Sequence, residues 1–252
     1  MRYFIILSYD GSAYHGWQIQ PNALSVQEVV EEALSKILRF RVSVTGAGRT
    51  DAGVHAEVMP AHFDSEVPIG ESGVFLNRLN SLLPKDIAAR QIEVVNAEAH
   101  ARFDALYRTY HYYLAGKKDP FSERYSCRYF GSLDFDAMNV AASYLKEVSD
   151  FTSFSKLHTD TKTNICNVTE AYWEQCGGRM RFVITADRFL RNMVRAVVGT
   201  LLEVGRGKMS FQEFVGVINS KNRCCAGTSM PANALFLVDV GYPDEIFKYN
   251  RK

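Results

Sequence analysis

The stretch of this sequence best suited to chemistry runs from residue 46 to residue 56 and reads GAGRTDAGVHA. Its glycines and small residues let the backbone approach a ligand closely. An aspartate such as Asp51 supplies a carboxylate that can act as a nucleophile or stabilise a developing oxocarbenium ion. For such a loop in general, a tight turn held by an Arg49–Asp51 ion pair is an equally good interpretation.

Better-known ligand loops and metal sites do not fit the sequence. A dinucleotide-binding loop needs a third glycine at fixed spacing and a following helix, and a P-loop needs Gly-Lys-Ser/Thr; neither pattern is present. His55 and His62 are separated by six residues that include a proline, so we do not expect them to share a metal. The five cysteines are odd in number and lack a Cys-x-x-Cys pair, which argues against a zinc ribbon or a disulfide scaffold.

Composition narrows the class of protein. The chain has 252 residues, of which 47% are hydrophobic, and its 29 Lys and Arg against 28 Asp and Glu give a net charge of +1. This excludes a disordered chain and a polyanion-coating protein, but not a nucleic-acid binder with clustered basic residues. No apolar run reaches the roughly 18–20 residues that cross a bilayer, and the N-terminus lacks the features of a signal peptide. We therefore expect a cytoplasmic protein without a membrane partner.

Strands and helices alternate around the 46–56 loop and must position it. In the first half, the patterns predict a helix from Ser25, another over 74–83, and strands over 2–9, 41–45 and 91–95. In the second half, they predict helices over 136–148, 189–204 and from Ser210, and strands over 108–114, 167–175, 180–185 and 234–242. We therefore expect an α+β fold of two RRM/ferredoxin-like halves, residues 1–104 and 105–252, with mainly antiparallel sheets flanking a central cleft.

Six further motifs, in order along nearly the whole chain, resemble those of the tRNA pseudouridine synthase A family, as does the 46–56 loop. They are YDGSxxHGWQ at 9–18, SVQ at 25–27, HARF at 100–103 with RTYHY at 108–112, DFTSF at 150–154, FLRNMVR at 189–195 with VGTL at 198–201, and MPANALFL at 230–237. The resemblance implies isomerisation of uridine to pseudouridine at positions 38, 39 and 40 of the tRNA anticodon stem-loop. It also implies a homodimer that needs no metal, nucleotide or organic cofactor.

The resemblance assigns roles to four residues. Asp51 matches the catalytic aspartate, and Arg195 matches the arginine that pairs with it and keeps it ionised. Tyr110 matches the active-site tyrosine, whose ring stacks on the flipped base and whose hydroxyl can assist removal of the C5 proton. Arg49 matches the residue that fills the vacated position in the base stack. Taken alone, Arg195 is better explained as a solvated helix charge, and Tyr110 as one of several strand tyrosines.

Basic residues suggest where RNA is contacted. Between Arg179 and Lys208 there are seven Lys or Arg against two acidic residues. Arg188 and Arg191 fall with Arg195 on one stripe of the expected helix, and such a stripe can follow a phosphate backbone, although an ordinary solvated face has the same pattern. Gln18 and Trp17 are further RNA-contact candidates, for which packing is an equally good interpretation.

Other hypotheses explain less of the sequence. An N-glycosidase or a nuclease built on Asp51 would need a second carboxylate or a cluster of metal-binding carboxylates, which the signature does not offer. A catalytically silent RNA-binding protein of two RRM-like halves is another hypothesis. It predicts aromatic strand motifs of the RRM type, which the sequence does not contain, and it leaves Asp51 unexplained. Glu57, Ser149 and the Asn233-Ala234 pair depart from the family pattern and leave its fine RNA specificity open.

Overall fold

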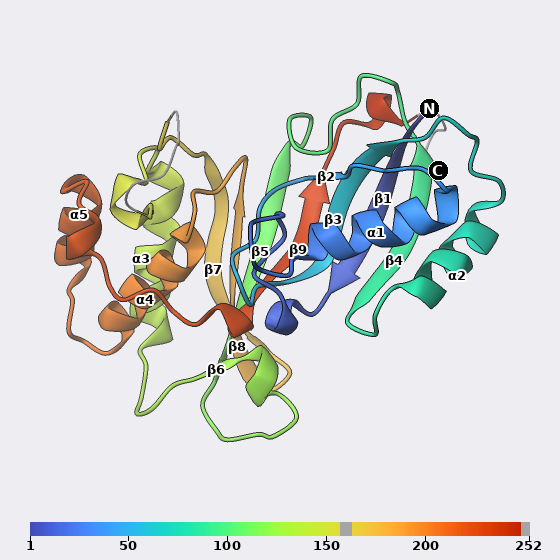
Figure 1. The fold of residues 1–252 in the computed structure, drawn as a ribbon. Helices are drawn as coiled ribbons and strands as arrows, with labels where there is room; N and C mark the ends of the chain where they lie inside the picture. Colours follow the sequence, from blue (N-terminus) through green and yellow to red (C-terminus); the bar gives the residue numbers. More distant parts are fainter. Residues whose placement is uncertain (157–162, 248–252) are drawn as a thin grey trace. The chain divides into compact units, whose positions relative to one another are not determined.

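The computed structural model describes residues 1–156 and 163–247, which divide by their internal contacts into two compact units (Figure 1). Unit 1 comprises Met1–Tyr107 and the C-terminal segment from Leu237, and unit 2 comprises Arg108–Phe236. These ranges differ from the expected 1–104 and 105–252 because the C-terminal segment belongs to unit 1. That the N-terminal domain carries the catalytic aspartate loop and the C-terminal domain completes the active-site cleft stays a prediction.

Unit 1 combines two helices, α1 (Val26–Leu38) and α2 (Ser72–Leu82), with a sheet in the order β4-β1-β3-β9. Strand β1 (Arg2–Tyr9) pairs antiparallel with both β3 (His55–Asp64) and β4 (Ile87–Val94). The short β2 (Thr45–Gly46) pairs antiparallel with β3, and β9 spans Leu235–Gly241. Figure 1 shows α1 crossing in front of this sheet with α2 beside it. Helix α1 buries Val26, Val30, Ala33 and Leu34, the spacing of one helical face.

The sequence patterns were wrong on both sides of the glycine-rich loop. The strand expected over 41–45 is absent except at its last residue, because the backbone there bonds to side chains of α1. The N–H groups of Val42 and Val44 donate to Ser35 Oγ and Glu31 Oε1, at 2.9 and 2.8 Å. No strand was predicted for β3, whose burial is nearly continuous rather than alternating and which contains Pro60. Nearly continuous burial indicates that both faces of the strand are covered, and it hides the period-2 signal.

Unit 2 contains α3 (Phe135–Tyr144), α4 (Met193–Gly205) and α5 (Phe211–Asn219) with a sheet in the order β5-β8-β7. Strands β5 (Tyr107–Ala115) and β7 (Val168–Cys176) each pair antiparallel with β8 (Arg179–Ala186), and β6 (Cys127–Arg128) pairs parallel with β5. The β7–β8 hairpin turns at Gly177-Gly178, whose positive φ angles of 55° and 77° confirm the predicted turn. Both units mix helices with mainly antiparallel strands, so the α+β fold class is confirmed.

Helix α4 begins four residues later than the sequence pattern predicts. Asn192 has a left-handed φ of 66°, which ends the preceding segment, and the helix starts at Met193. Arg188 and Arg191 therefore lie before the helix and do not share a helical stripe with Arg195, which corrects that expectation. No helix within the described ranges is long and apolar enough to cross a membrane.

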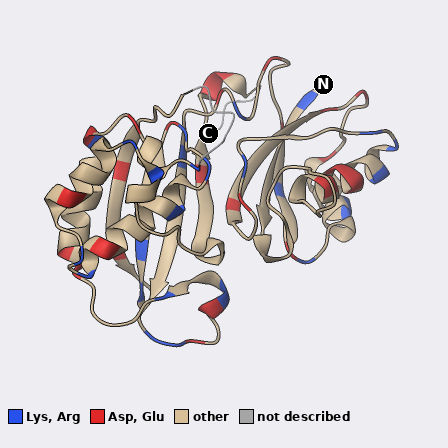
Figure 2. Cartoon of the chain, turned by 60° about the vertical axis from the view of Figure 1, so that its left-hand side comes forward, with Lys and Arg blue, Asp and Glu red and all other residues tan. Residues whose placement is uncertain are grey.

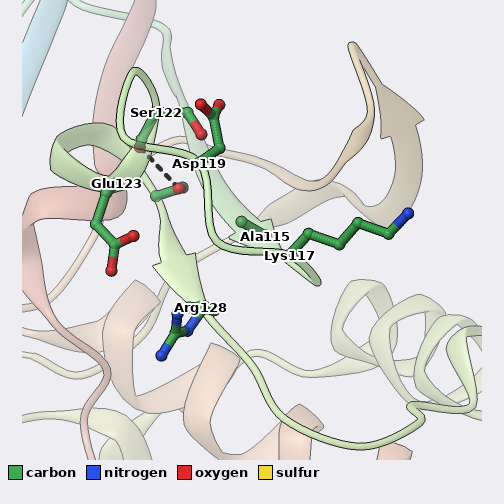
Figure 3. Close-up of a pocket in the computed structure, with 7 residues that line it drawn as sticks. Ala115, Lys117, Asp119, Ser122, Glu123 and Arg128 are labelled. Atoms are coloured by element: carbon green, nitrogen blue, oxygen red, sulfur yellow. Dashed lines mark hydrogen bonds between the residues drawn. The ribbon is translucent and has the colours of Figure 1, made fainter.

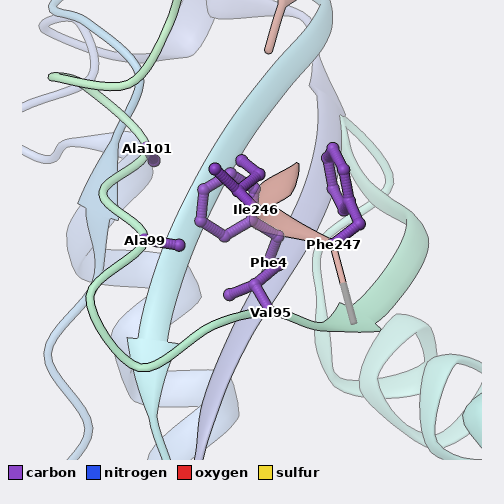
Figure 4. Close-up of a cluster of buried hydrophobic side chains, with 6 residues drawn as sticks. All are labelled: Phe4, Val95, Ala99, Ala101, Ile246 and Phe247. Atoms are coloured by element: carbon purple, nitrogen blue, oxygen red, sulfur yellow. The ribbon is translucent and has the colours of Figure 1, made fainter. Parts of the chain in front are cut away.

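The C-terminal segment closes a hydrophobic cluster around Phe4 of β1 (Figure 4). The other members of this cluster are Val95, Ala99, Ala101, Ile246 and Phe247. The Asn96 N–H donates to the carbonyl of Ile246 at 2.9 Å, and the Phe4 ring meets that of Phe247 edge-on at 6.1 Å. Residues 95–101 are thereby held from two sides, by β1 and by the C-terminal segment.

A buried histidine beside this cluster makes stability depend on pH. His62 Nδ1 accepts the Ala101 N–H at 3.0 Å, and burial, with smaller effects of His100 and Arg2, lowers the pKa of His62 to about 4. The unfolded chain, with a histidine pKa near 6.5, binds more protons, so the free energy of unfolding should fall as pH drops from 6.5 toward 4. The loss from this group should be roughly 1–2 kcal/mol at pH 5.

Urea unfolding at pH 7 and pH 5 measures this loss. The His62→Asn variant keeps an acceptor for the Ala101 N–H but has no titrating ring. We expect a smaller loss of unfolding free energy between the two pH values for this variant than for the wild type. Equal losses would show that His62 is not the group responsible.

Candidate functional site

The loop that carries Asp51 joins β2 to β3 and is bound on both sides of Asp51 by β1 and the segment after it. The Thr50 carbonyl accepts the Trp17 N–H at 3.3 Å, and Thr50 Oγ1 hydrogen-bonds the Tyr9 hydroxyl at 2.8 Å. The Gly53 N–H donates to the Tyr14 carbonyl at 3.3 Å. Asp51 is half-buried between these anchors. The backbone around its carboxylate is therefore immobilised by contacts of sequence-distant residues.

Two glycines after β1 make this close packing possible. A Cβ at Gly11 would lie 2.0 Å from the Val54 carbonyl oxygen, and a Cβ at Gly16 would lie 2.3 Å from that of Thr50. Gly16 also has a φ of 91°, which side-chain-bearing residues rarely adopt. Backbone therefore packs directly on backbone where the segment after β1 meets the Asp51 loop.

Trp17 belongs to this packing, although the sequence made it an RNA-contact candidate. It is 3% exposed, its ring lies 6.2 Å from that of Tyr9, and a Cβ at Gly46 would lie 2.6 Å from its indole. The indole is therefore a packing element of the loop. Gln18 and Arg49, two other candidates, are exposed.

His55 ties the loop to the strand that follows it. It is 1% exposed at the start of β3, and its Nδ1 accepts the Gly11 N–H at 3.0 Å. The same nitrogen lies 3.1 Å from Asp10 Oδ1, a contact that becomes an ion pair only if the ring is protonated. The described residues contain no group of three His, Cys, Asp or Glu arranged to hold a metal.

In unit 2, Tyr110 lies on β5 opposite Ile184 of β8. Its half-buried ring meets Phe189 edge-on, with ring centres 5.1 Å apart. Phe189 belongs to the non-helical segment before α4, which also carries Arg188 and Arg191. Tyr110 therefore contacts the segment that carries the two arginine candidates, and this segment is not a helix face.

Arg195, in the first turn of α4, is a fixed side chain rather than a solvated charge. Its Nε donates to the Met230 carbonyl at 2.6 Å, and the Met230 N–H donates to the Arg195 carbonyl at 3.1 Å. The segment with Met230 packs tightly on α4, because a Cβ at Gly199 would lie 1.9 Å from the Thr228 carbonyl oxygen. The direction of the guanidinium is therefore set by backbone atoms from a segment 35 residues away.

Sequence reasoning missed the residues that hold this segment. Asn192 Nδ2 and Arg223 Nη2 both donate to Ser229 Oγ, at 2.5 and 2.7 Å. Arg223 also donates to the Gly227 carbonyl at 3.1 Å. No periodicity or spacing identifies such residues, because their partners are loop backbone and a serine.

The candidate residues are divided between the units. Asp51, Arg49, Gln18 and Trp17 lie in unit 1, and Tyr110, Arg188, Arg191 and Arg195 lie in unit 2. The Arg195–Asp51 pair therefore stays a prediction. Figure 2 shows Lys and Arg interspersed with Asp and Glu in each unit, as the net charge of +1 suggests.

Two hollows in unit 2 are too small for a nucleotide. The one in Figure 3 holds about 10 Å³, room for about one water, beside the bond from Ser126 Oγ to the Ser122 carbonyl. A neighbouring hollow of about 240 Å³ is lined by Lys117, Asp119 and Arg179 among others. Pockets for small ligands usually measure about 300–1,000 Å³. Neither hollow includes a candidate residue.

Comparison with known proteins gives a consistent match. A family model described as tRNA pseudouridine synthase matches residues 5–104 and 141–243. A tRNA pseudouridine synthase A of Parabacteroides distasonis is 58% identical over 98% of both chains, and that of Bacteroides thetaiotaomicron is 57% identical over 100% of this chain and 94% of its own. The enzyme of Bacillus licheniformis is 39% identical over 96% of this chain and 99% of its own.

Proposed function

Since the chain belongs to the tRNA pseudouridine synthase family, whose members isomerise tRNA uridine to pseudouridine, we propose that it acts at positions 38, 39 and 40 of the anticodon stem-loop. The observation that supports catalysis by this chain most directly is the Asp51 loop. Its backbone is bound to Tyr14 and Trp17, and Tyr9 holds the Thr50 side chain. A charged carboxylate on an immobilised loop is what a reaction at a ribose carbon requires.

The isomerisation conserves all atoms and electrons. The bond between N1 of uracil and C1′ breaks, the base turns over, and a bond forms between C5 and C1′. The proton on C5 leaves, and N1 gains one. No oxidant or reductant takes part, and the proposed enzyme uses no metal, nucleotide or organic cofactor. Asp51 carries the reaction by nucleophilic attack or by stabilising positive charge on the sugar.

The other candidate residues serve Asp51 and the RNA. Arg195, oriented by Met230, pairs with the Asp51 carboxylate and keeps it ionised. Tyr110 stacks on the flipped uracil, and its hydroxyl assists removal of the C5 proton. Arg49, exposed on the loop, fills the position that the uridine vacates.

The wider proposal concerns RNA contacts, architecture and assembly. Arg188, Arg191 and Gln18 contact the tRNA outside the reacting base. The two units are RRM/ferredoxin-like halves flanking a cleft that receives the anticodon stem-loop. The enzyme is a cytoplasmic homodimer without a membrane partner.

Release of tritium from tRNA labelled at C5 of uridine tests the proposed function. The wild type, with no cofactor added, should release tritium from a tRNA transcript with uridine at positions 38–40 and none when all three are cytidine. Chemical mapping of the product should place pseudouridine at these positions. A folded wild type that binds tRNA but releases no tritium would instead favour a silent RNA-binding protein.

A further inference from the structure

An exposed aromatic ring in unit 1 is unused by the proposed mechanism. Phe103, in the segment between β4 and β5, is 74% exposed. Its ring packs on that of His100 with centres 4.2 Å apart, and the Arg102 guanidinium lies 5.8 Å from its centre. We call this arrangement the His100–Phe103 stack. Most of the phenylalanine ring remains open to solvent, so packing within the unit does not account for an aromatic residue at this position.

The stack is rigid rather than part of a frayed loop. His100 Nδ1 accepts the N–H groups of Arg102 and Phe103 at 3.1 and 3.3 Å. The Asp104 carboxylate accepts the His100 N–H at 2.8 Å, and the Asp104 N–H donates to the His100 carbonyl at 3.0 Å. Burial lowers the pKa of His100, which favours the neutral ring that can accept these bonds. The backbone of the turn is therefore fixed, and the Phe103 ring packs on His100 while most of it faces solvent.

The base of the turn is anchored in the unit. The Ala101 N–H donates to buried His62, whose ring lies 4.6 Å from that of His100. Ala99 and Ala101 belong to the hydrophobic cluster around Phe4, and the Tyr242 hydroxyl donates to the Ala101 carbonyl. An exposed ring on such a support loses little conformational entropy when a planar ligand stacks on it.

We propose that the His100–Phe103 stack binds an unpaired base of the tRNA substrate, with Arg102 beside it for the adjoining phosphate. An aromatic ring flanked by a guanidinium is the combination on which proteins stack unpaired bases. The proposal rests on the proposed function only for the identity of the RNA.

The stacked base is not the reacting uridine. The Asp51 loop enters β3 at His55, whereas the stack is anchored at His62, seven residues further along the same strand. The Asp51 end of the loop is tied through Thr50 to Tyr9, which pairs with Ala56 of β3, six residues from His62. At about 3.3 Å per residue, Ala56 and His62 lie roughly 20 Å apart. The stack therefore holds a second nucleotide and contributes to substrate binding rather than to bond breaking.

Substitutions at Phe103 test this proposal with separate readouts for binding and chemistry. Phe103→Ala should raise the dissociation constant and the KM for tRNA by about 5- to 100-fold, with kcat within about twofold. Leu106→Ala, which removes a 58% exposed apolar side chain from the same segment, should leave all three within about twofold. Phe103→Trp, which keeps an aromatic ring at this position, should bind tRNA with an affinity close to that of the wild type.

The Phe103→Trp variant also reports stacking directly. The two native tryptophans, Trp17 and Trp173, are 3% and 4% exposed, so the introduced indole is the solvent-exposed fluorophore. Adding tRNA to Phe103→Trp combined with Asp51→Asn should quench its emission, whereas a fully paired RNA duplex should not.

Three results would overturn the proposal. Phe103→Ala could bind tRNA as tightly as the wild type does, or tRNA could fail to quench the indole of Phe103→Trp. Alternatively, Phe103→Ala could change the oligomeric state of the protein and leave its affinity for tRNA unchanged. If tRNA quenches the introduced indole but the wild type releases no tritium, the proposed function is wrong and the proposal that the His100–Phe103 stack binds a base is retained.

Discussion

Replacing Asp51 by Asn should abolish tritium release from C5-labelled tRNA, by at least about 10³-fold in kcat, while the protein still binds tRNA. The amide has the size of the carboxylate but no charge, so it can neither attack the ribose carbon nor stabilise positive charge there. The anchors at Thr50 and Gly53 involve atoms of other residues, so the loop should keep its place. Single-turnover release and filter binding on the same preparation measure both quantities.

The matched control is Glu57→Gln, which removes one exposed carboxylate just after the loop. We expect its tritium release to stay within about twofold of the wild type, since exposed charges contribute little. If Asp51→Asn kept substantial turnover, Asp51 would not be the catalytic carboxylate. If it lost tRNA binding in proportion to turnover, its role would be in binding.

The Gly16→Ala variant should lose both stability and turnover. The new Cβ would lie 2.3 Å from the Thr50 carbonyl oxygen, at a φ of 91° that alanine rarely adopts. Strain and overpacking together should cost roughly 2–4 kcal/mol of unfolding free energy. Relief of the clash must move Thr50 away from Gly16 and take Asp51 with it, and a shift of about 1 Å at a catalytic group can cost about 100-fold in rate.

Gly48→Ala is the control for this variant, because a Cβ there meets nothing within 4 Å and the residue lies in the same loop. Thermal melts and urea unfolding should place Gly48→Ala within about 0.5 kcal/mol of the wild type and Gly16→Ala well below both. Similar melting curves for the two variants would show that the Gly16–Thr50 contact does not restrain the loop.

The sequence by itself determined the family, the α+β class and most of the regular elements. The 46–56 loop and the other ordered motifs carried the family, and helical spacing from Val26 predicted the buried face of α1. The Gly177-Gly178 turn was also predicted correctly. These features follow from local spacing and local turn chemistry, so they can be read one segment at a time.

Tertiary structure decided what depends on partners distant in the chain. The segment before Thr45 is not a strand, because α1 side chains take its hydrogen bonds. Strand β3 is buried almost throughout, so no alternation marks it. Trp17 is a packing residue because Gly46 has no side chain and leaves room for its indole.

Dependence on partners distant in the chain also decides which features of the site can be predicted from the sequence. The type of Asp51 and the loop around it are visible in the sequence. The fixing of that loop by Thr50 and Gly16, and the orientation of Arg195 by Met230, are not. Both depend on main-chain atoms, and every residue type supplies the same carbonyl. Only the folded chain determines which carbonyl lies within hydrogen-bonding distance of which side chain.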